Sequence, residues 1–268
     1  YEAGVVAALQ ELSPDMLKSA SRIYGASSGS VVATLTLCEC DQDEVKLSFL
    51  RALKFSLWGF IPGGTIPKIL KDVLNKHLPT NAHQLVSGKL HIILTRLRDW
   101  RSVTVSDFAS REDLIQAVIC SCFVPVYFGF IPPKYNGVHY VDGELAMWQN
   151  NFVSRNTITI SSFAGEYDIC PKDSAAAFFT FQISDCILHI SKRNICRLQC
   201  IFQMPTRQAL DEIRKHGYED TVVFLKRLRP CQLQKSSFDP AAAVEPSSRS
   251  KERKSHLQPS LQTDTDLH

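Results

Sequence analysis

Apolar residues recur at helical spacing over much of the chain. Residues 4–12 place them on one face of an amphipathic helix, and Pro14 ends that helix. Ser110 and Asp113 precede an apolar run in the pattern of a capping box, which predicts a helix that ends near Cys122. Further helices are predicted over residues 30–38, 43–60, 68–77 and 206–228.

Other segments alternate between apolar and polar residues or are rich in β-branched residues, as strands are. Residues 90–97 are the longest of them. Because such segments alternate with helices, the pattern predicts a layered α/β fold with helices on both faces of one sheet. The remaining predicted strands are residues 22–24, 102–108, 138–141 and 157–163.

Composition narrows the class of protein. The chain has 268 residues, of which 44% are hydrophobic, and this suits a globular domain with a substantial core. A formal net charge of +3 gives no argument for nucleic-acid binding. No uninterrupted apolar run reaches the roughly 20 residues of a spanning helix. Nine cysteines without C-x-x-C spacing favour a reduced chain without a structural zinc site.

A Gly-x-Ser-x-Gly sequence is centred on Ser27, between Gly25 and Gly29. Its glycines permit a tight turn from strand to helix that lifts the serine out of the sheet. The following helix would direct free N–H groups at the site, where negative charge develops in acyl transfer. A tight turn with close helix packing explains the same five residues, and the motif alone leaves both interpretations open.

Asp142 is the candidate base, because a serine hydroxyl is a poor nucleophile without one. It follows a predicted strand and precedes Gly143, so its carboxylate can be aimed at a site on the same sheet edge as Ser27. Asp-Gly is also a common turn sequence, and spacing alone does not decide between a turn and a base. None of the eight histidines follows a predicted strand beside a partner acid, so no triad is predicted.

Several longer motifs occur in a recognisable order. They are residues 23–29 (IYGASSG), 121–127 (SCFVPVY), 131–133 (IPP), 140–143 (YVDG), 157–161 (TITIS) and 168–171 (DICP). Together they resemble the patatin-like phospholipases, in the branch of adipose triglyceride lipase and adiponutrin, over about residues 1–230. Residues 146–149 and 217–228 are most similar to the epidermal ω-hydroxyceramide transacylases of that branch.

The resemblance implies a three-layer α/β/α sandwich and a Ser–Asp dyad in place of a triad, with no metal and no cofactor. Ser27 would attack an ester carbonyl, and Asp142 would accept its proton and later activate water or an alcohol. The backbone N–H of Ser28 would help to bind the oxyanion. A partly desolvated pocket would raise the pKa of Asp142 towards neutrality. Backbone geometry would come from Gly25, Gly29 and Gly143.

Three features depart from the family pattern. The family's G-x-G-x-x-G oxyanion loop would end just before Tyr1, so the chain as written is expected to be N-terminally truncated and impaired in catalysis. Glu144 follows Gly143 where the family usually has glycine or alanine, and residues 146–149 replace the usual Asn-Leu-Pro. These departures leave open an alternative, a catalytically impaired scaffold that sequesters a lipase partner at a lipid surface.

Retention of Ser27 and Asp142 favours a serine acyl hydrolase or transacylase acting on triacylglycerol or another lipid acyl ester, with ω-hydroxyceramide as a candidate acceptor. We expect it in the cytoplasm, peripheral on lipid droplets or membranes, with a lipase co-activator as a candidate partner and no nucleic acid. The apolar stretches 55–61 and 178–190 suit either a lipid surface or the core. Predicted domains are a patatin-like domain (1–155), a helical extension (156–230) and a disordered tail (231–268).

Overall fold

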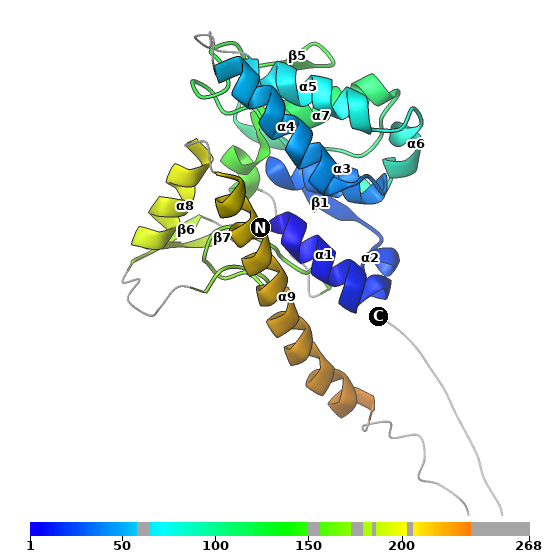
Figure 1. The fold of residues 1–268 in the computed structure, drawn as a ribbon, viewed down its shortest axis with the longest axis vertical. Coiled ribbons are helices and arrows are strands. Elements are labelled where there is room, and N and C mark those ends of the chain that lie inside the picture. Colours follow the sequence, from blue (N-terminus) through cyan, green and yellow to red (C-terminus); the bar gives the residue numbers. More distant parts are fainter. Residues whose placement is uncertain (58–64, 150–155, 173–178, 184–185, 203–205, 237–268) are drawn as a thin grey trace, which may run out of the picture. The chain divides into compact units, whose positions relative to one another are not determined.

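A computed structural model describes residues 1–57, 65–149, 156–172, 179–183, 186–202 and 206–236 (Figure 1). Helices alternate with strands in it, which confirms the predicted α/β class. The helices are α1 (Glu2–Leu12), α2 (Pro14–Ser19), α3 (Ser28–Leu37), α4 (Gln42–Leu57), α5 (Thr65–His77), α6 (Ala82–Val86), α7 (Arg111–Ser121), the 3₁₀ helix η1 (Gly143–Gln149), α8 (Lys192–Phe202) and α9 (Arg207–Ser236). The strands are β1 (Ile23–Gly25), β2 (Leu90–Arg96), β3 (Arg101–Val105), β4 (Lys134–Tyr135), β5 (Val138–Asp142), β6 (Phe179–Ile183) and β7 (Cys186–Ile190).

Strand β2 is the centre of the main sheet. Ile92 pairs with Gly25 of β1 on one edge and with Val105 of β3 on the other. Leu94 also pairs with β3, and its second partner is Asp142 of β5. Since β3 pairs with residues 92–96 of β2 along one edge, β1 at Ile92 and β5 at Leu94 must share the opposite edge. Strand β1 runs parallel to β2, whereas β5 runs antiparallel to it.

Helices α3 and α7 pack on this sheet, and α5 and α6 pack on α7. The N-cap predicted for α7 is present, because the side chain of Ser110 accepts the backbone N–H of Asp113 at 3.1 Å. The carboxylate of Asp113 accepts the N–H of Ala109, the residue before the N-cap, at 3.0 Å. The most completely buried side chains come from the sheet and from these helices, and include Leu74, Leu90, Ile92, Leu94, Leu114 and Ile115.

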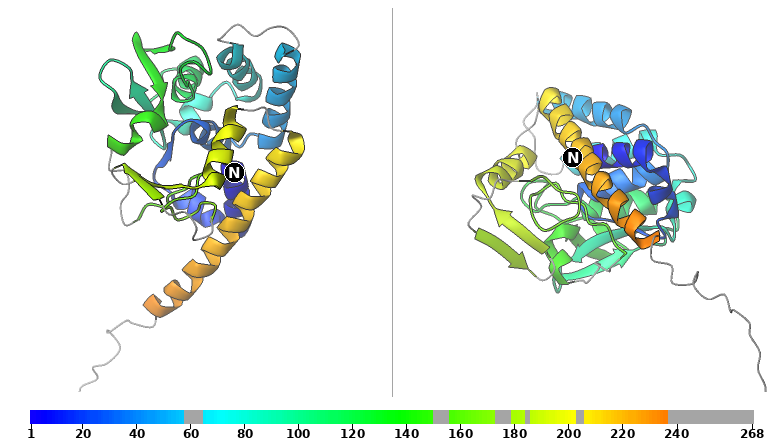
Figure 2. Two further views of the ribbon diagram at one scale, coloured as in Figure 1. Left: turned by 90° about the vertical axis from the view of Figure 1, so that its left-hand side faces the viewer. Right: turned by 90° about the horizontal axis from the view of Figure 1, so that it is seen from below.

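Helix α9 runs across α1 (Figure 2), and the two backbones approach closely at two glycines. A Cβ added to Gly4 would lie 1.9 Å from the carbonyl oxygen of Arg214, and one added to Gly217 would lie 2.2 Å from that of Tyr1. The hydroxyl of Tyr1 donates to the carboxylate of Asp220 at 2.7 Å. The two glycines thus allow backbone contact that fixes the start of α1.

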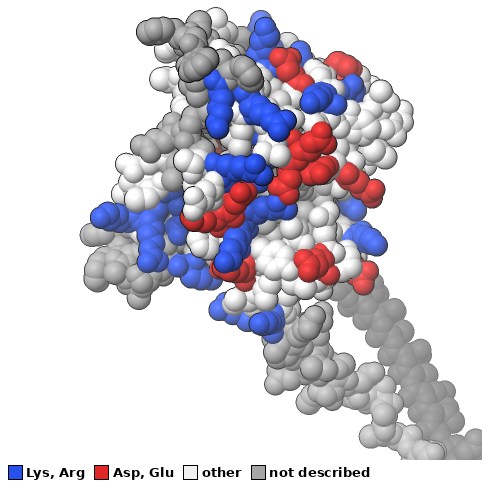
Figure 3. All heavy atoms as spheres, viewed as in Figure 1, with Lys and Arg blue, Asp and Glu red and all other residues white. Residues whose placement is uncertain are grey.

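Charged side chains join α9 to α4 as well. Lys46 lies 3.0 Å from the carboxylate of Asp43 and 2.9 Å from that of Asp211, and Arg214 also pairs with Asp43. Acidic and basic side chains lie close together on this face of the molecule, while basic ones gather over α8 (Figure 3). A mixed surface of this kind agrees with the small net charge of the sequence.

The strand predicted over residues 157–163 is wrong. This segment forms a single bridge between Ile160 and Ile169, and the carboxylate of Asp168 accepts the N–H and hydroxyl of Thr159 at 2.7 and 2.8 Å. A side chain therefore satisfies the backbone donor that a neighbouring strand would have satisfied.

The segment predicted as a helical extension also contains strands, because β6 and β7 form an antiparallel hairpin before α8 and α9. Residues 1–227 form one compact unit, which does not include the end of α9 from residue 228 to residue 236. Helix α9 continues to Ser236, so the first six residues of the predicted disordered tail are helical. Residues 237–268 lie outside the described residues. The side chains of the apolar stretch 55–61 also lie outside them. Within the described part of the chain, no helix is both long enough and apolar enough to cross a bilayer.

Candidate active site

The ends of β1 and β5 converge on one residue of β2. Strand β1 pairs with residues 90–92 and ends at Gly25, two residues before Ser27. Strand β5 pairs with residues 94–96 in the opposite direction and ends at Asp142. The two strands therefore run towards each other along the same edge of β2 and meet at Ile93. The sequence predicted that Asp142, at the end of a strand, could be aimed at a site on the same sheet edge as Ser27; in the structure the two strand ends face each other along β2.

Ser27 and Asp142 are in direct contact at this point. The hydroxyl of Ser27 donates a hydrogen bond to Oδ2 of Asp142, with 2.6 Å between the oxygens. Ser27 has φ 50° and ψ −129°, a backbone conformation that L-residues rarely adopt and that turns sharply from β1 into α3. Strained backbone of this kind is common at functional sites, because the surrounding structure must hold it in place.

Three residues hold the backbone of Ser27 in place by hydrogen bonds. Its N–H donates to the hydroxyl of Ser121 at 3.0 Å, and that hydroxyl, fully buried, donates to the carbonyl of Ile93 at 2.8 Å. Its carbonyl accepts the N–H and hydroxyl of Ser30 at 3.0 and 2.7 Å and the thiol of Cys122 at 3.2 Å. Burial, and after it repulsion from the Asp142 carboxylate, raises the pKa of the Cys122 thiol. The thiol therefore stays protonated and can donate this hydrogen bond.

The carboxylate of Asp142 is almost inaccessible, with 4% of the residue exposed. Its Oδ1 accepts the backbone N–H of Glu144 at 2.9 Å, while its own N–H donates to the carbonyl of Phe123 at 2.8 Å. Burial raises its pKa to about 6, although the hydrogen bonds from Ser27 and from the N–H of Glu144 act in the opposite direction. The negative charge of Glu2 adds to the increase.

Two further carboxylates lie near the dyad. Glu2, the first residue of α1, accepts the hydroxyl of Ser28 at 2.9 Å and that of Ser162 at 3.3 Å. Loss of hydration, followed by repulsion from Asp142 and Glu2, raises the pKa of Glu144. Glu144 is nevertheless solvent-exposed as a residue, so water limits this shift. The site is thus acidic around the Ser27 hydroxyl.

Two of the three predicted glycines are required by close contacts. A Cβ on Gly25 would lie 2.7 Å from Cα of Ser30, and one on Gly143 would lie 2.1 Å from the carbonyl oxygen of Ile93. Gly29 differs, since a Cβ there would have no neighbour closer than 3.9 Å. The structure therefore gives a steric reason for glycine at 25 and 143, and none at 29.

Ser28 occupies the first turn of α3 beside Ser27. Within the described residues its backbone N–H has no hydrogen-bond partner, so it can donate to an anion placed over Ser27. The positive end of the helix dipole favours negative charge at the same place. The role of oxyanion donor stays a prediction for Ser28, whose N–H is available, whereas the N–H of Ser27 is already used by Ser121.

Sequence reasoning missed Glu2, Ser121 and Cys122 as neighbours of the dyad. The motif at residues 121–127 contributes to the family resemblance, but it does not indicate a role for Ser121 or Cys122. A serine within the buried run of α7 is the one local signal, because a buried hydroxyl needs hydrogen-bond partners. Glu2 carries no comparable signal, since an acidic residue in the first turn of a helix is common.

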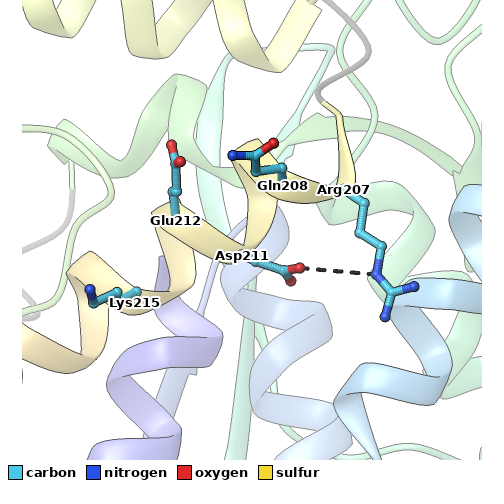
Figure 4. Close-up of a pocket in the computed structure, with 5 residues that line it drawn as sticks. All are labelled: Arg207, Gln208, Asp211, Glu212 and Lys215. Atoms are coloured by element: carbon cyan, nitrogen blue, oxygen red, sulfur yellow. Dashed lines mark ion pairs between the residues drawn. The ribbon is translucent and has the colours of Figure 1, made fainter.

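A hollow along α9 is a different feature and does not belong to this site. Arg207, Gln208, Asp211, Glu212 and Lys215 line it, and all five project from one helix (Figure 4). An ion pair of 4.0 Å between Arg207 and Asp211 crosses part of it. The hollow is wide open, and neither Ser27 nor Asp142 lines it.

Comparison with known proteins identifies the family. The sequence profile of the patatin-like phospholipases matches residues 1–154, which include Ser27 and Asp142. The chain belongs to the patatin-like phospholipase family. The predicted patatin-like fold is thereby confirmed, and a lipid acyl hydrolase or acyltransferase is the family's general activity.

Curated relatives include three human members of the patatin-like family. ω-Hydroxyceramide transacylase is 40% identical over 88% of this chain and 45% of its own length. Patatin-like phospholipase domain-containing protein 2 is 38% identical over 85% and 46%, and 1-acylglycerol-3-phosphate O-acyltransferase PNPLA3 is 38% identical over 91% and 53%. The chain therefore spans about half the length of the relatives that it matches.

Proposed function

We propose that the protein is a serine acyl hydrolase or transacylase that acts on the acyl esters of neutral lipids. Ser27 is the nucleophile and Asp142 is the base. The observation that carries the proposal is the 2.6 Å hydrogen bond between the Ser27 hydroxyl and the buried Asp142 carboxylate. The relatives support a lipid substrate in general, since one is named for acyl transfer to ω-hydroxyceramide and another for acyl transfer to an acylglycerol phosphate.

The chemistry follows from the contacts of the two residues. As Ser27 Oγ attacks the ester carbonyl, its proton passes to Oδ2 of Asp142, and the developing oxyanion is stabilised by the N–H of Ser28. The protonated Asp142 then gives the proton to the leaving alcohol, and the acyl group remains on Ser27. Water or a lipid hydroxyl, deprotonated by Asp142, finally removes that acyl group.

Burial of Asp142 suits this role. A carboxylate with a pKa of about 6 is still ionised at pH 7, yet it binds a proton more strongly than an ordinary aspartate does. The same base can serve either acceptor, so the choice between hydrolysis and transacylation depends on which molecule occupies the pocket during deacylation. We propose that the reaction takes place at the surface of lipid droplets or membranes, where such esters are found.

The test uses the full-length protein with radiolabelled triacylglycerol, with and without ω-hydroxyceramide, beside a Ser27→Ala variant. We expect labelled ceramide or labelled fatty acid, and loss of either product by a factor of about 10³ or more in the variant. Label in ceramide identifies a transacylase, and label only in fatty acid identifies a lipase. If neither product depends on Ser27, the enzyme proposal fails and the lipid-surface scaffold replaces it.

A pH profile tests the assignment of the base. Since Asp142 must be ionised to accept a proton, turnover of a water-soluble ester is expected to rise with pH through a midpoint near 6. Glu2 raises the pKa of Asp142 by charge repulsion, so Glu2→Gln is expected to move that midpoint to lower pH. Glutamine keeps an acceptor for Ser28, which leaves that contact intact.

Glu212→Gln, a matched change of an exposed residue on α9, is the control and should leave the midpoint in place. A midpoint that stays fixed or moves to higher pH in Glu2→Gln would contradict the assignment of the acid limb to Asp142.

A further inference from the structure

The segment that joins α7 to β4 exposes its apolar side chains to water. We call residues 124–133 the apolar loop; it contains no charged residue. Val126, Phe130 and Ile131 are exposed by 73, 80 and 82%, whereas no other large hydrophobic residue of the described chain exceeds 52%. Single exposed apolar residues are ordinary on protein surfaces, but three so exposed in one short loop are a concentrated patch.

The apolar loop is held in this exposed conformation. The N–H of Val126 donates to the carbonyl of Gly129 at 2.8 Å, and the N–H of Phe128 donates to that of Val124 at 2.9 Å. Val126 has φ 72°, which is a rare and strained value for a β-branched residue. Strain of this kind persists only where the surrounding structure holds it, and here the side chain gains no burial from it.

Both ends of the apolar loop are attached to β5, the strand that carries the base. At its start, the carbonyl of Phe123 accepts the N–H of Asp142 at 2.8 Å. At its end, the carbonyl of Pro133 accepts the N–H of Tyr140 at 3.1 Å, and that of Pro132 lies 2.7 Å from the ring of His139. A molecule bound by the loop is thereby placed next to the candidate active site.

We propose that the apolar loop docks the protein on a lipid surface, with Phe130 and Ile131 inserted among the acyl chains beside the candidate active site. This inference rests on the proposed function for the nature of the surface, because a lipid ester has to reach Ser27 from such an interface.

Two properties of the loop favour lipid over a protein partner. A lipid interior offers no partner to backbone N–H groups. Three of the ten loop residues are prolines, which have no N–H, and the N–H groups of Val126 and Phe128 are bonded within the loop. Lys134 follows at once and is exposed, so its ammonium can remain among the headgroups while the apolar residues insert.

The test measures flotation of full-length Ser27→Ala protein with triacylglycerol emulsions coated with phosphatidylcholine. In that background, Phe130→Asp with Ile131→Asp is expected to lower the partition coefficient by a factor of about 10 or more. Each substitution removes the favourable free energy of moving a large apolar side chain from water into lipid. The matched control, Leu85→Asp with Val223→Asp, changes two exposed apolar residues on α6 and α9 and is expected to lower it less than about twofold.

Equal binding by the loop variant and the control would overturn the inference. So would a loop variant that binds the emulsion normally but loses self-association in light scattering, because the loop would then bind a second copy. If the loop variant unfolds at a lower temperature than the control, the Phe130→Trp variant is used to test insertion. Quenching of the added tryptophan's fluorescence by brominated lipid supports insertion, and the absence of added quenching contradicts it.

The result is separable from the proposed function. Flotation is measured without a nucleophile, so loop-dependent binding combined with no Ser27-dependent turnover would overturn the proposed function and leave docking in place. Ser27-dependent turnover combined with loop-independent binding would overturn docking by the apolar loop and leave the proposed function in place.

Discussion

Replacement of Asp142 by asparagine is expected to lower the turnover of a water-soluble ester by a factor of about 10²–10⁴. Asparagine has nearly the same shape: its oxygen can accept the N–H of Glu144 while its NH2 group donates to the Ser27 hydroxyl, but it cannot accept a proton. The 2.6 Å contact would therefore survive in form while its chemistry is lost. Turnover within tenfold of the unaltered protein would contradict the role of Asp142 as base.

The same substitution is not expected to destabilise the protein. Burial raises the pKa of Asp142, which means that folding favours its protonated form and that the ionised carboxylate opposes folding above about pH 6. A neutral asparagine removes that opposition. Thermal unfolding at pH 7.5 should therefore give a midpoint equal to or above that of the unaltered protein, beside Asp15→Asn as a matched change of an exposed aspartate on α2. A lowered midpoint would show that the loss of activity has a structural cause.

Local sequence patterns were enough to predict Ser27 after a short strand and Asp142 at the end of another. Each prediction depends on a few neighbouring residues: glycines for a tight turn, and alternating apolar residues for a strand. The contact between the two residues depends on something else, namely the register by which β1 and β5 pair with opposite halves of β2. Strand pairing between distant segments leaves no local signal in a single sequence, so the facing strand ends could not be predicted.

The misread segments have a similar explanation. Residues 157–163 alternate like a strand, but the carboxylate of Asp168 satisfies Thr159 and the segment closes on itself. Ser121 lies in an apolar run that predicted a buried helix, and the helix is present. Its hydroxyl joins Ser27 to Ile93 only because α7 packs on β2, which is again a matter of tertiary structure.

Replacement of Gly143 by alanine is expected to disable the site through geometry alone. A Cβ at this position would lie 2.1 Å from the carbonyl oxygen and 2.7 Å from the carbonyl carbon of Ile93, both of them backbone atoms in the central strand. A flexible side chain could move aside, but a paired strand cannot, so the end of β5 would have to shift and carry Asp142 with it. A displacement of about 1 Å at a reacting group costs about 10²-fold in rate.

The expected result is a loss of turnover of about 10²-fold or more, with a decrease of about 1–3 kcal/mol in the free energy of unfolding from overpacking. Urea denaturation and ester turnover measure the two effects. Gly29→Ala is the control for folding, because its Cβ would have no neighbour closer than 3.9 Å, and it should unfold at the same urea concentration as the unaltered protein or a higher one. If Gly143→Ala matched the unaltered protein in both measurements, Ile93 and the end of β5 could not be as close as the structure has them. The register that brings Asp142 to Ser27 would then be wrong as well.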